Sequence, residues 1–133
     1  MSDWHPRMWG CGYCGTMAYA LAQKFGWKLG IIYGVDREDN EFFEDYPHAV
    51  AIVDRKENLL ADSVGIDIFR NIVKYCVFNG DIVDRAYRET TKEELLQIYG
   101  EDILDDEPLI EAYKFIEKNL DKYEKSSILE LSA

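Results

Sequence analysis

Hydrophobic residues near the start of the chain recur with the period of an α-helix. They occupy positions i, i+3, i+4, i+7 and i+11 of one face, namely Cys14, Met17, Ala18, Leu21 and Phe25. This spacing predicts an amphipathic helix over 13–25, with its apolar face turned to the core. Gly26 follows at a position where helices commonly end. Cys14 therefore lies in the first helical turn, where the helix dipole favours a thiolate over a thiol.

Apolar segments after this helix predict strands. Residues 27–33 form the first, and residues 48–53 form the second, which is apolar on both faces and should be covered on both sides. The polar residues 54–58 predict a turn. Residues 59–64 then return as the second strand of a hairpin, and Gly65 is expected to end it.

The following segment carries mixed signals. Residues 66–75 have the apolar spacing of a short helix. Residues 77–78 and 82–87 are weaker strand candidates on either side of Asn79-Gly80, a dipeptide typical of hairpin turns.

Two further helices are predicted near the C-terminus. Thr91 and Glu94 have the spacing of a capping box, at the start of a helix that runs to about Tyr99. A last helix is expected over 107–123, and its buried stripe would comprise Leu109, Ala112, Tyr113, Ile116 and Leu120.

The length and composition favour one folded domain over residues 1–133. The chain is 47% hydrophobic and 14% aromatic, which is enough to build a core. We expect an α+β fold in which the N-terminal Cys-bearing helix packs on a small antiparallel sheet, followed by C-terminal helices. No apolar run is long enough to span a membrane, and the N-terminus has no apolar signal core, so we expect a cytoplasmic protein. The oligomeric state is left open.

The chain is strongly acidic. It has 26 Asp and Glu against 15 Lys and Arg, so its net charge is −11. A nucleic-acid partner is therefore not expected, because phosphate binding needs a basic surface. Residues 36–45 contain six carboxylates and one arginine. These residues form either an acidic edge of the functional site, which attracts a basic protein or peptide, or simply a solvated loop.

Cys14, His48 and Asp62 are the candidate catalytic residues. If the hairpin turn centres on Lys56, His48 and Asp62 lie on one face as diagonal neighbours, within reach of each other's side chains. If the helix packs on that face, Cys14 completes a set of nucleophile, general base and orienting carboxylate. Each residue also has a structural alternative: a small buried thiol, a core histidine and a carboxylate that caps a turn.

The same residues carry a resemblance. Cys11-Gly12-Tyr13-Cys14 resembles the Cys-Gly-Ser-Cys segment of papain-like cysteine peptidases, and the order of helix Cys, strand His and next-strand Asp resembles their superfamily, which includes transglutaminase-like enzymes. The patterns Gly-x-Cys, Ala-x-Ala-Leu, Phe-Gly-Trp, His-Ala-Val and Leu-x-Asp-x-x-Gly are similar to those of small uncharacterised proteins of bacteria and their phages with that fold. The resemblance covers about residues 10–65.

The resemblance implies a papain-like domain with Cys14 as nucleophile, His48 as general base and Asp62 as orienter. It implies a hydrolase or acyltransferase acting on an amide or isopeptide bond of a protein or peptide. Met8 stands where papain-type enzymes carry an oxyanion-hole Gln. The oxyanion would then depend on backbone N–H groups, such as that of Cys14.

Two other hypotheses for the function of the chain stay open. One is a non-catalytic, acidic binding or inhibitor protein, bacterial or phage-encoded, that uses the papain-like fold to engage a basic protein. The other is a zinc site, since Cys11 and Cys14 have zinc-ligand spacing and His5, His48 or Cys76 could complete it. A structural zinc site usually takes a second closely spaced ligand pair, and none is present, so no metal or other cofactor is expected.

Overall fold

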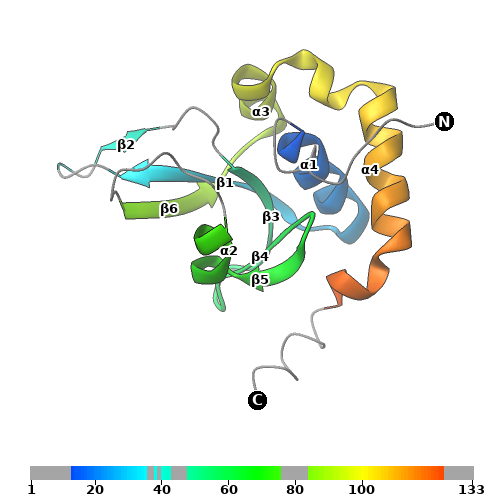
Figure 1. Ribbon diagram of the computed structural model, residues 1–133. Helices are drawn as coiled ribbons and strands as arrows, with labels where there is room; N and C mark the ends of the chain where they lie inside the picture. Colours follow the sequence, from blue (N-terminus) through cyan, green and yellow to red (C-terminus); the bar gives the residue numbers. More distant parts are fainter. Residues whose placement is uncertain (1–12, 36–37, 39, 43–47, 76–83, 125–133) are drawn as a thin grey trace.

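A computed structural model describes residues 13–35, 38, 40–42, 48–75 and 84–124. These residues form the expected α+β fold: an N-terminal helix, an antiparallel sheet and C-terminal helices (Figure 1). The strand candidate 77–78 and part of the candidate 82–87 lie outside the described residues, as does most of the acidic segment 36–45.

The first helix, α1, spans Cys14–Phe25, close to its predicted bounds. Most of its residues are buried, and alanines make up much of the buried face. Gly26 ends the helix in the left-handed conformation, with φ of 72°, and its N–H donates to the Ala22 carbonyl. A residue without Cβ adopts this conformation without strain, which is why Gly is common at this position.

The sheet has six strands in the order β2-β1-β3-β4-β5, and β6 also pairs with β1. Every pairing is antiparallel, and the bounds are Lys28–Val35 for β1, Glu41–Phe42 for β2, His48–Asp54 for β3, Leu59–Asp62 for β4, Gly65–Ile68 for β5 and Asp84–Glu89 for β6. The β3–β4 hairpin has the predicted register, since Ala51 lies opposite Ala61 and Ile52 opposite Leu60. One irregularity follows Ile52, before the turn.

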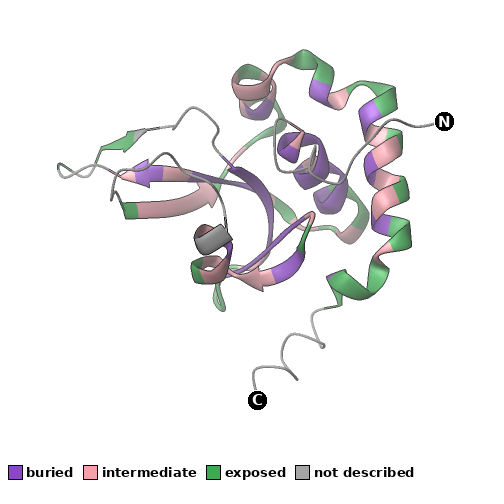
Figure 2. Cartoon of the chain, in the orientation of Figure 1, coloured by how far each residue is buried: buried purple, intermediate pink, exposed green. Residues whose placement is uncertain are grey.

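Both faces of β3 are buried, as its sequence indicated. Ala51 and Ala61 pack with α1, whereas Val50 and Leu60 pack with Ile72 in a second cluster on the other face. The small side chains under α1 let the helix lie close to the sheet. Figure 2 shows the buried residues concentrated in α1 and in the strands beneath it. By strand alternation, α1 covers the face opposite to the one that was expected to carry the site.

The segment after β4 corrects two predictions. Gly65 does not end the hairpin; it pairs with Asp62 and begins β5, so Ser63 and Val64 form a two-residue turn. Residues 66–68 continue this strand and are not helical, because Ile-Asp-Ile has the alternation of a strand. The helix α2 is shorter than predicted and spans Phe69–Tyr75.

The C-terminal part contains α3 (Lys92–Tyr99), the 3₁₀ helix η2 (Glu101–Leu104), α4 (Asp106–Lys118) and the 3₁₀ helix η3 (Leu120–Tyr123). The last helix therefore ends earlier than predicted. Ala112 and Ile116 of its stripe are buried, but Leu120 is 41% exposed, because it falls beyond the helix that the pattern assumed to continue.

Half of the predicted capping box forms at the start of α3. The Thr91 hydroxyl accepts the N–H of Glu94 at 3.1 Å. The Glu94 carboxylate does not complete the box; it binds the Arg88 guanidinium at 2.7 Å and the Thr90 hydroxyl. The cap is thus provided by Thr91, while Glu94 ties α3 to β6.

We expect Thr91→Ala to lower the free energy of unfolding by about 1 kcal/mol, because it leaves the Glu94 N–H without its cap. Thr91 is exposed, so the change creates no cavity. Urea denaturation followed by circular dichroism measures the effect, with Thr91→Ser as the control that keeps the hydroxyl. Equal stability of the Ala and Ser variants would contradict this role.

Candidate active site

Cys14 is the first residue of α1 and is 4% exposed. It packs in a cluster with Ala18 of the same helix, Ala49 of β3, Leu95 of α3 and Ile103 of η2. Four elements therefore meet around the thiol. The first-turn N–H groups of α1 have no acceptor within the helix, and their partial positive charge points toward this end.

His48, Ala49 and Tyr99 contact the Cys14 sulfur. The side chain of His48 and the backbone N–H of Ala49 hydrogen-bond to it, and the Tyr99 hydroxyl oxygen lies 3.3 Å away. At that distance the thiol can donate to the hydroxyl, and the hydroxyl can donate to a thiolate. Among the described residues, the pairing of β3 with β4 ends at Ala51. The backbone at the start of β3 is therefore not paired with β4, and the Cys14 sulfur can lie against it.

His48 and Asp62 belong by strand alternation to the face of the sheet that α1 does not cover, yet His48 reaches Cys14 of α1. Val50 and Leu60 face away from α1, yet His48 and Cys14 meet. Both are the first residues of their elements, so they contact each other at the end of the sheet and not across its middle.

His48 is joined to Asp62 by a buried hydrogen bond. The ring Nε2 lies 3.0 Å from Oδ2 of Asp62, as the predicted diagonal register allows. With Nε2 turned to the carboxylate, Nδ1 is the ring nitrogen left for Cys14. A carboxylate in this position selects one tautomer and orientation of the imidazole.

Asp62 is itself held by two further contacts. Its Oδ1 accepts the N–H of Val64 at 2.9 Å, within the tight turn to β5. Its backbone carbonyl accepts the buried hydroxyl of Tyr123 in η3, also at 2.9 Å. Burial, and then the nearby negative charge of Asp62, raise the pKa of Tyr123, so this hydroxyl stays a donor.

The surroundings of Cys14 shift its pKa in opposite directions. Burial raises the pKa, because a thiolate is poorly solvated away from water. The hydrogen bond and positive charge of His48, followed by the Ala49 N–H and the Tyr99 hydroxyl, lower it by more. The net result is a pKa below the ordinary value of 9.0. The site thus favours the form of sulfur that acts as a nucleophile.

The structure brings together all three residues singled out in the sequence. Tyr99 and Tyr123 were missed, since both lie outside the segment that carries the resemblance. Tyr99 had one available signal: it follows the buried Leu95 by four residues, on the same side of α3.

The zinc alternative concerns residues that are largely outside the described part. Cys11, His5 and Cys76 are among those residues, as is Met8. Within the described ranges, no group of three or more His, Cys, Asp or Glu side chains is placed to hold a metal ion.

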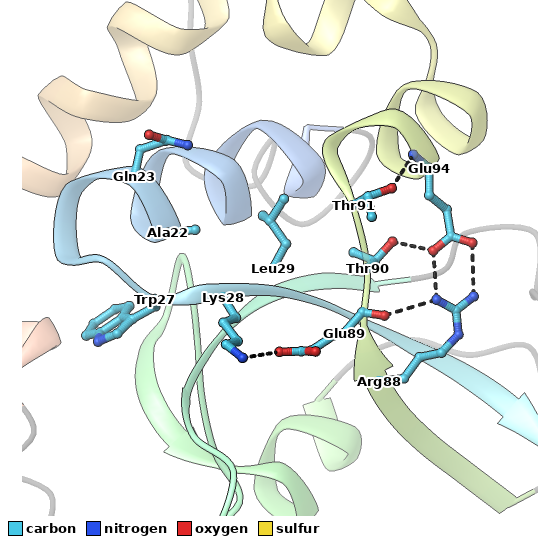
Figure 3. Close-up of a pocket in the computed structure, with 10 residues that line it drawn as sticks. All are labelled: Ala22, Gln23, Trp27, Lys28, Leu29, Arg88, Glu89, Thr90, Thr91 and Glu94. Atoms are coloured by element: carbon cyan, nitrogen blue, oxygen red, sulfur yellow. Dashed lines mark hydrogen bonds and ion pairs between the residues drawn. The ribbon is translucent and has the colours of Figure 1, made fainter.

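Figure 3 shows a pocket that is separate from Cys14, His48 and Asp62. It has a volume of about 600 Å³ and lies between the end of α1, the start of β1, the end of β6 and the start of α3. Its charged side chains pair with one another: Lys28 binds Glu89 at 2.9 Å, and Arg88 binds Glu94. None of Cys14, His48 and Asp62 lines it.

Comparison of the chain with protein-family models, with curated proteins and with solved structures finds no match. In the part of the chain that the structure describes, no helix is both long enough and apolar enough to cross a membrane.

We expect His48→Ala to raise the pKa of Cys14, because the variant keeps the burial and removes the strongest contacts that lower the pKa. Alkylation by iodoacetamide at a series of pH values, followed by peptide mapping, measures the midpoint for Cys14. In the wild type this midpoint should lie below 9.0.

The matched control is His5→Ala, which replaces the other histidine of the chain. It should leave the midpoint of Cys14 unchanged. A midpoint that is the same in His48→Ala and the wild type would show that His48 does not stabilise the thiolate.

Proposed function

We propose that this protein is a cysteine-nucleophile hydrolase or acyltransferase of papain-like type, acting on an amide or isopeptide bond. The observation that carries the proposal is the continuous contact from the Cys14 sulfur to His48 and from His48 to Asp62. Nucleophile, base and orienter in hydrogen-bond reach are what such chemistry requires. The resemblance over residues 10–65 supports the same assignment.

Each residue has a defined step in this mechanism. The Cys14 thiolate attacks the carbonyl carbon, a C–S bond forms, and the π pair of the carbonyl moves onto its oxygen. The intermediate collapses as the C–N bond breaks, and protonated His48 gives its proton to the leaving nitrogen. His48 then accepts a proton from the water or amine that attacks the acyl-enzyme, and the C–S bond breaks so that the Cys14 thiolate is regenerated. Asp62 keeps the imidazole in place through Nε2 during both steps.

A cytoplasmic location belongs to the same proposal, because a reducing compartment keeps the thiol available. The substrate class follows from charge. At a net charge of −11, the protein repels nucleic acid and attracts peptides rich in Lys and Arg.

The proposal predicts a graded loss of activity on peptide amides with a fluorogenic leaving amine. Cys14→Ala should abolish turnover, and His48→Ala should lower it by about 10²–10⁴-fold, the usual contribution of a general base. Asp62→Asn should cost less than His48→Ala, because it removes the orienting charge and keeps the base.

Glu57→Gln is the control for these variants, since Glu57 lies in the exposed turn between β3 and β4. It should have wild-type activity. Unchanged turnover by Cys14→Ala would exclude Cys14 as the nucleophile.

The burial of Cys14 favours a second candidate, a binding protein that does not use the thiol. Only 4% of this residue and 9% of His48 are exposed in the described structure. In that case Cys14→Ala would bind a basic protein partner with wild-type affinity, and the wild type would cleave nothing. Measuring binding and turnover on the same variant separates the two candidates.

The acidic segment gives a prediction that both candidates share. Replacing Glu38, Asp39 and Glu44 by their amides should slow association with an Arg- and Lys-rich peptide in low salt. The difference should disappear above about 0.1 M ionic strength, where the screening length falls to about 10 Å. Glu41 is left in place, because it binds Arg88 at 3.0 Å.

A variant with three exposed carboxylates neutralised elsewhere, at Glu57, Glu101 and Asp121, has the same net charge and is the matched control. Stopped-flow association rates compare the two variants. Equal rates would mean that only the total charge matters and that the segment has no local steering role.

A further inference from the structure

The Tyr99 hydroxyl lies 3.3 Å from the Cys14 sulfur, within hydrogen-bond distance. Tyr99 is the last residue of α3 and lies 85 positions after Cys14 in the chain. It is only partly buried, and its hydroxyl reaches the sulfur from the C-terminal half of the protein. Figure 1 shows α3 beside the N-terminal end of α1.

Packing holds the Tyr99 ring in this position. A Cβ added at Gly15 would meet the ring at 3.1 Å and the Ile103 side chain at 3.0 Å, so the absence of a side chain at Gly15 lets both approach the helix. The buried Thr16 hydroxyl donates to the Ile103 carbonyl at 2.6 Å and fixes η2, directly after α3. Leu95, one helical turn before Tyr99, is fully buried in the Cys14 cluster.

The position of the hydroxyl suits a second role in the reaction. When the sulfur attacks, negative charge leaves it and develops on an oxygen attached to the same carbon. That oxygen is therefore close to the sulfur, and a donor already in contact with the sulfur can reach it with a small displacement. A neutral hydroxyl can donate without losing its proton, as in other oxyanion sites that use Tyr.

We propose that Tyr99 supplies the side-chain hydrogen bond to the oxyanion formed when Cys14 attacks, together with backbone N–H groups at the start of α1. This inference rests on the proposed function and assigns a further catalytic residue to it. It also accounts for Met8, which offers no donor at the position where papain-type enzymes carry Gln. The C–S bond forms, the carbonyl π pair moves to oxygen, and Tyr99 keeps its proton throughout.

Two reagents that react with the same sulfur separate this role from thiolate stabilisation. Iodoacetamide alkylates sulfur without forming an oxyanion, whereas p-nitrophenyl acetate acylates it through one. Rates for Cys14 are measured by peptide mapping on the full chain, at a pH on the plateau where the thiol is fully ionised in every variant. We expect Tyr99→Phe to keep the alkylation rate and to lose about 10²–10³-fold in acylation rate.

Tyr87→Phe is the matched control, because its hydroxyl binds Asn58 at 2.6 Å, away from the site, and the chemical change is identical. It should react with both reagents at the wild-type rate. Gly15→Ala is an independent variant that displaces the Tyr99 ring and keeps its hydroxyl, and it should slow acylation more than alkylation. This second variant keeps the test available if Tyr99→Phe does not fold.

The possible failures differ. If Tyr99→Phe is acylated at the wild-type plateau rate, or loses both reactions equally, Tyr99 is not an oxyanion donor, and the proposed function stands. If Cys14 of the folded wild type reacts with neither reagent, the proposed function is wrong and this inference fails with it.

Discussion

The burial of the Cys14 thiol is the constraint on which the candidate site depends. A thiol that is only buried stays protonated and behaves as a small apolar residue. Here His48, the first residue of β3, contributes a hydrogen bond and a positive charge, and the backbone N–H of Ala49 contributes a second hydrogen bond. Tyr99 of α3 contributes a third. Together they outweigh the cost of burial. The lowered pKa of the thiol therefore depends on three elements and not on its helix alone.

The C-terminal half contributes two contacts to this arrangement, although its sequence shows no resemblance to the papain-like pattern. Tyr123 of η3 holds the backbone of Asp62, and Tyr99 of α3 holds the sulfur. The α3 helix is in turn tied to the sheet, since Arg88 of β6 binds both Glu94 and Glu41. A shortened chain that ended after β5 would keep Cys14, His48 and Asp62 but lose both tyrosines.

Local patterns predicted much of this fold and of the candidate site. The apolar period of α1, the Gly26 cap and the Thr91 cap depend on neighbouring residues, and all three formed. The His48–Asp62 contact was also predictable, because one hairpin register determines it. The prediction was wrong where the apolar spacing fits both a helix and a strand, as it does at Ile66 and Ile68. The pairing of Gly65 with Asp62 makes this segment a strand.

Long-range contacts were beyond any local pattern. The face of the sheet that α1 covers is determined by which side has residues small enough for the helix to approach, and Ala51 and Ala61 provide that side. The face that carries His48 and Asp62 was the one on which the helix would have had to pack for the triad to form across the sheet. Tyr99 could be placed on the inner side of its helix from Leu95, but not beside Cys14, because no local pattern connects two residues that are 85 positions apart in the chain.

The burial of Cys14, His48 and Asp62 in contact with one another has an energetic cost. Moving an ionisable pair out of water is costly, and a well-packed apolar pair of similar volume is often at least as stabilising. The buried His48–Asp62 hydrogen bond is therefore poor evidence for a stabilising role. A structural core at this position would be served by residues like the neighbouring Val50 and Leu60, which need no partners. The contact of a thiol, an imidazole and a carboxylate in the interior therefore supports the proposed proton transfer at Cys14 more than a role in stability.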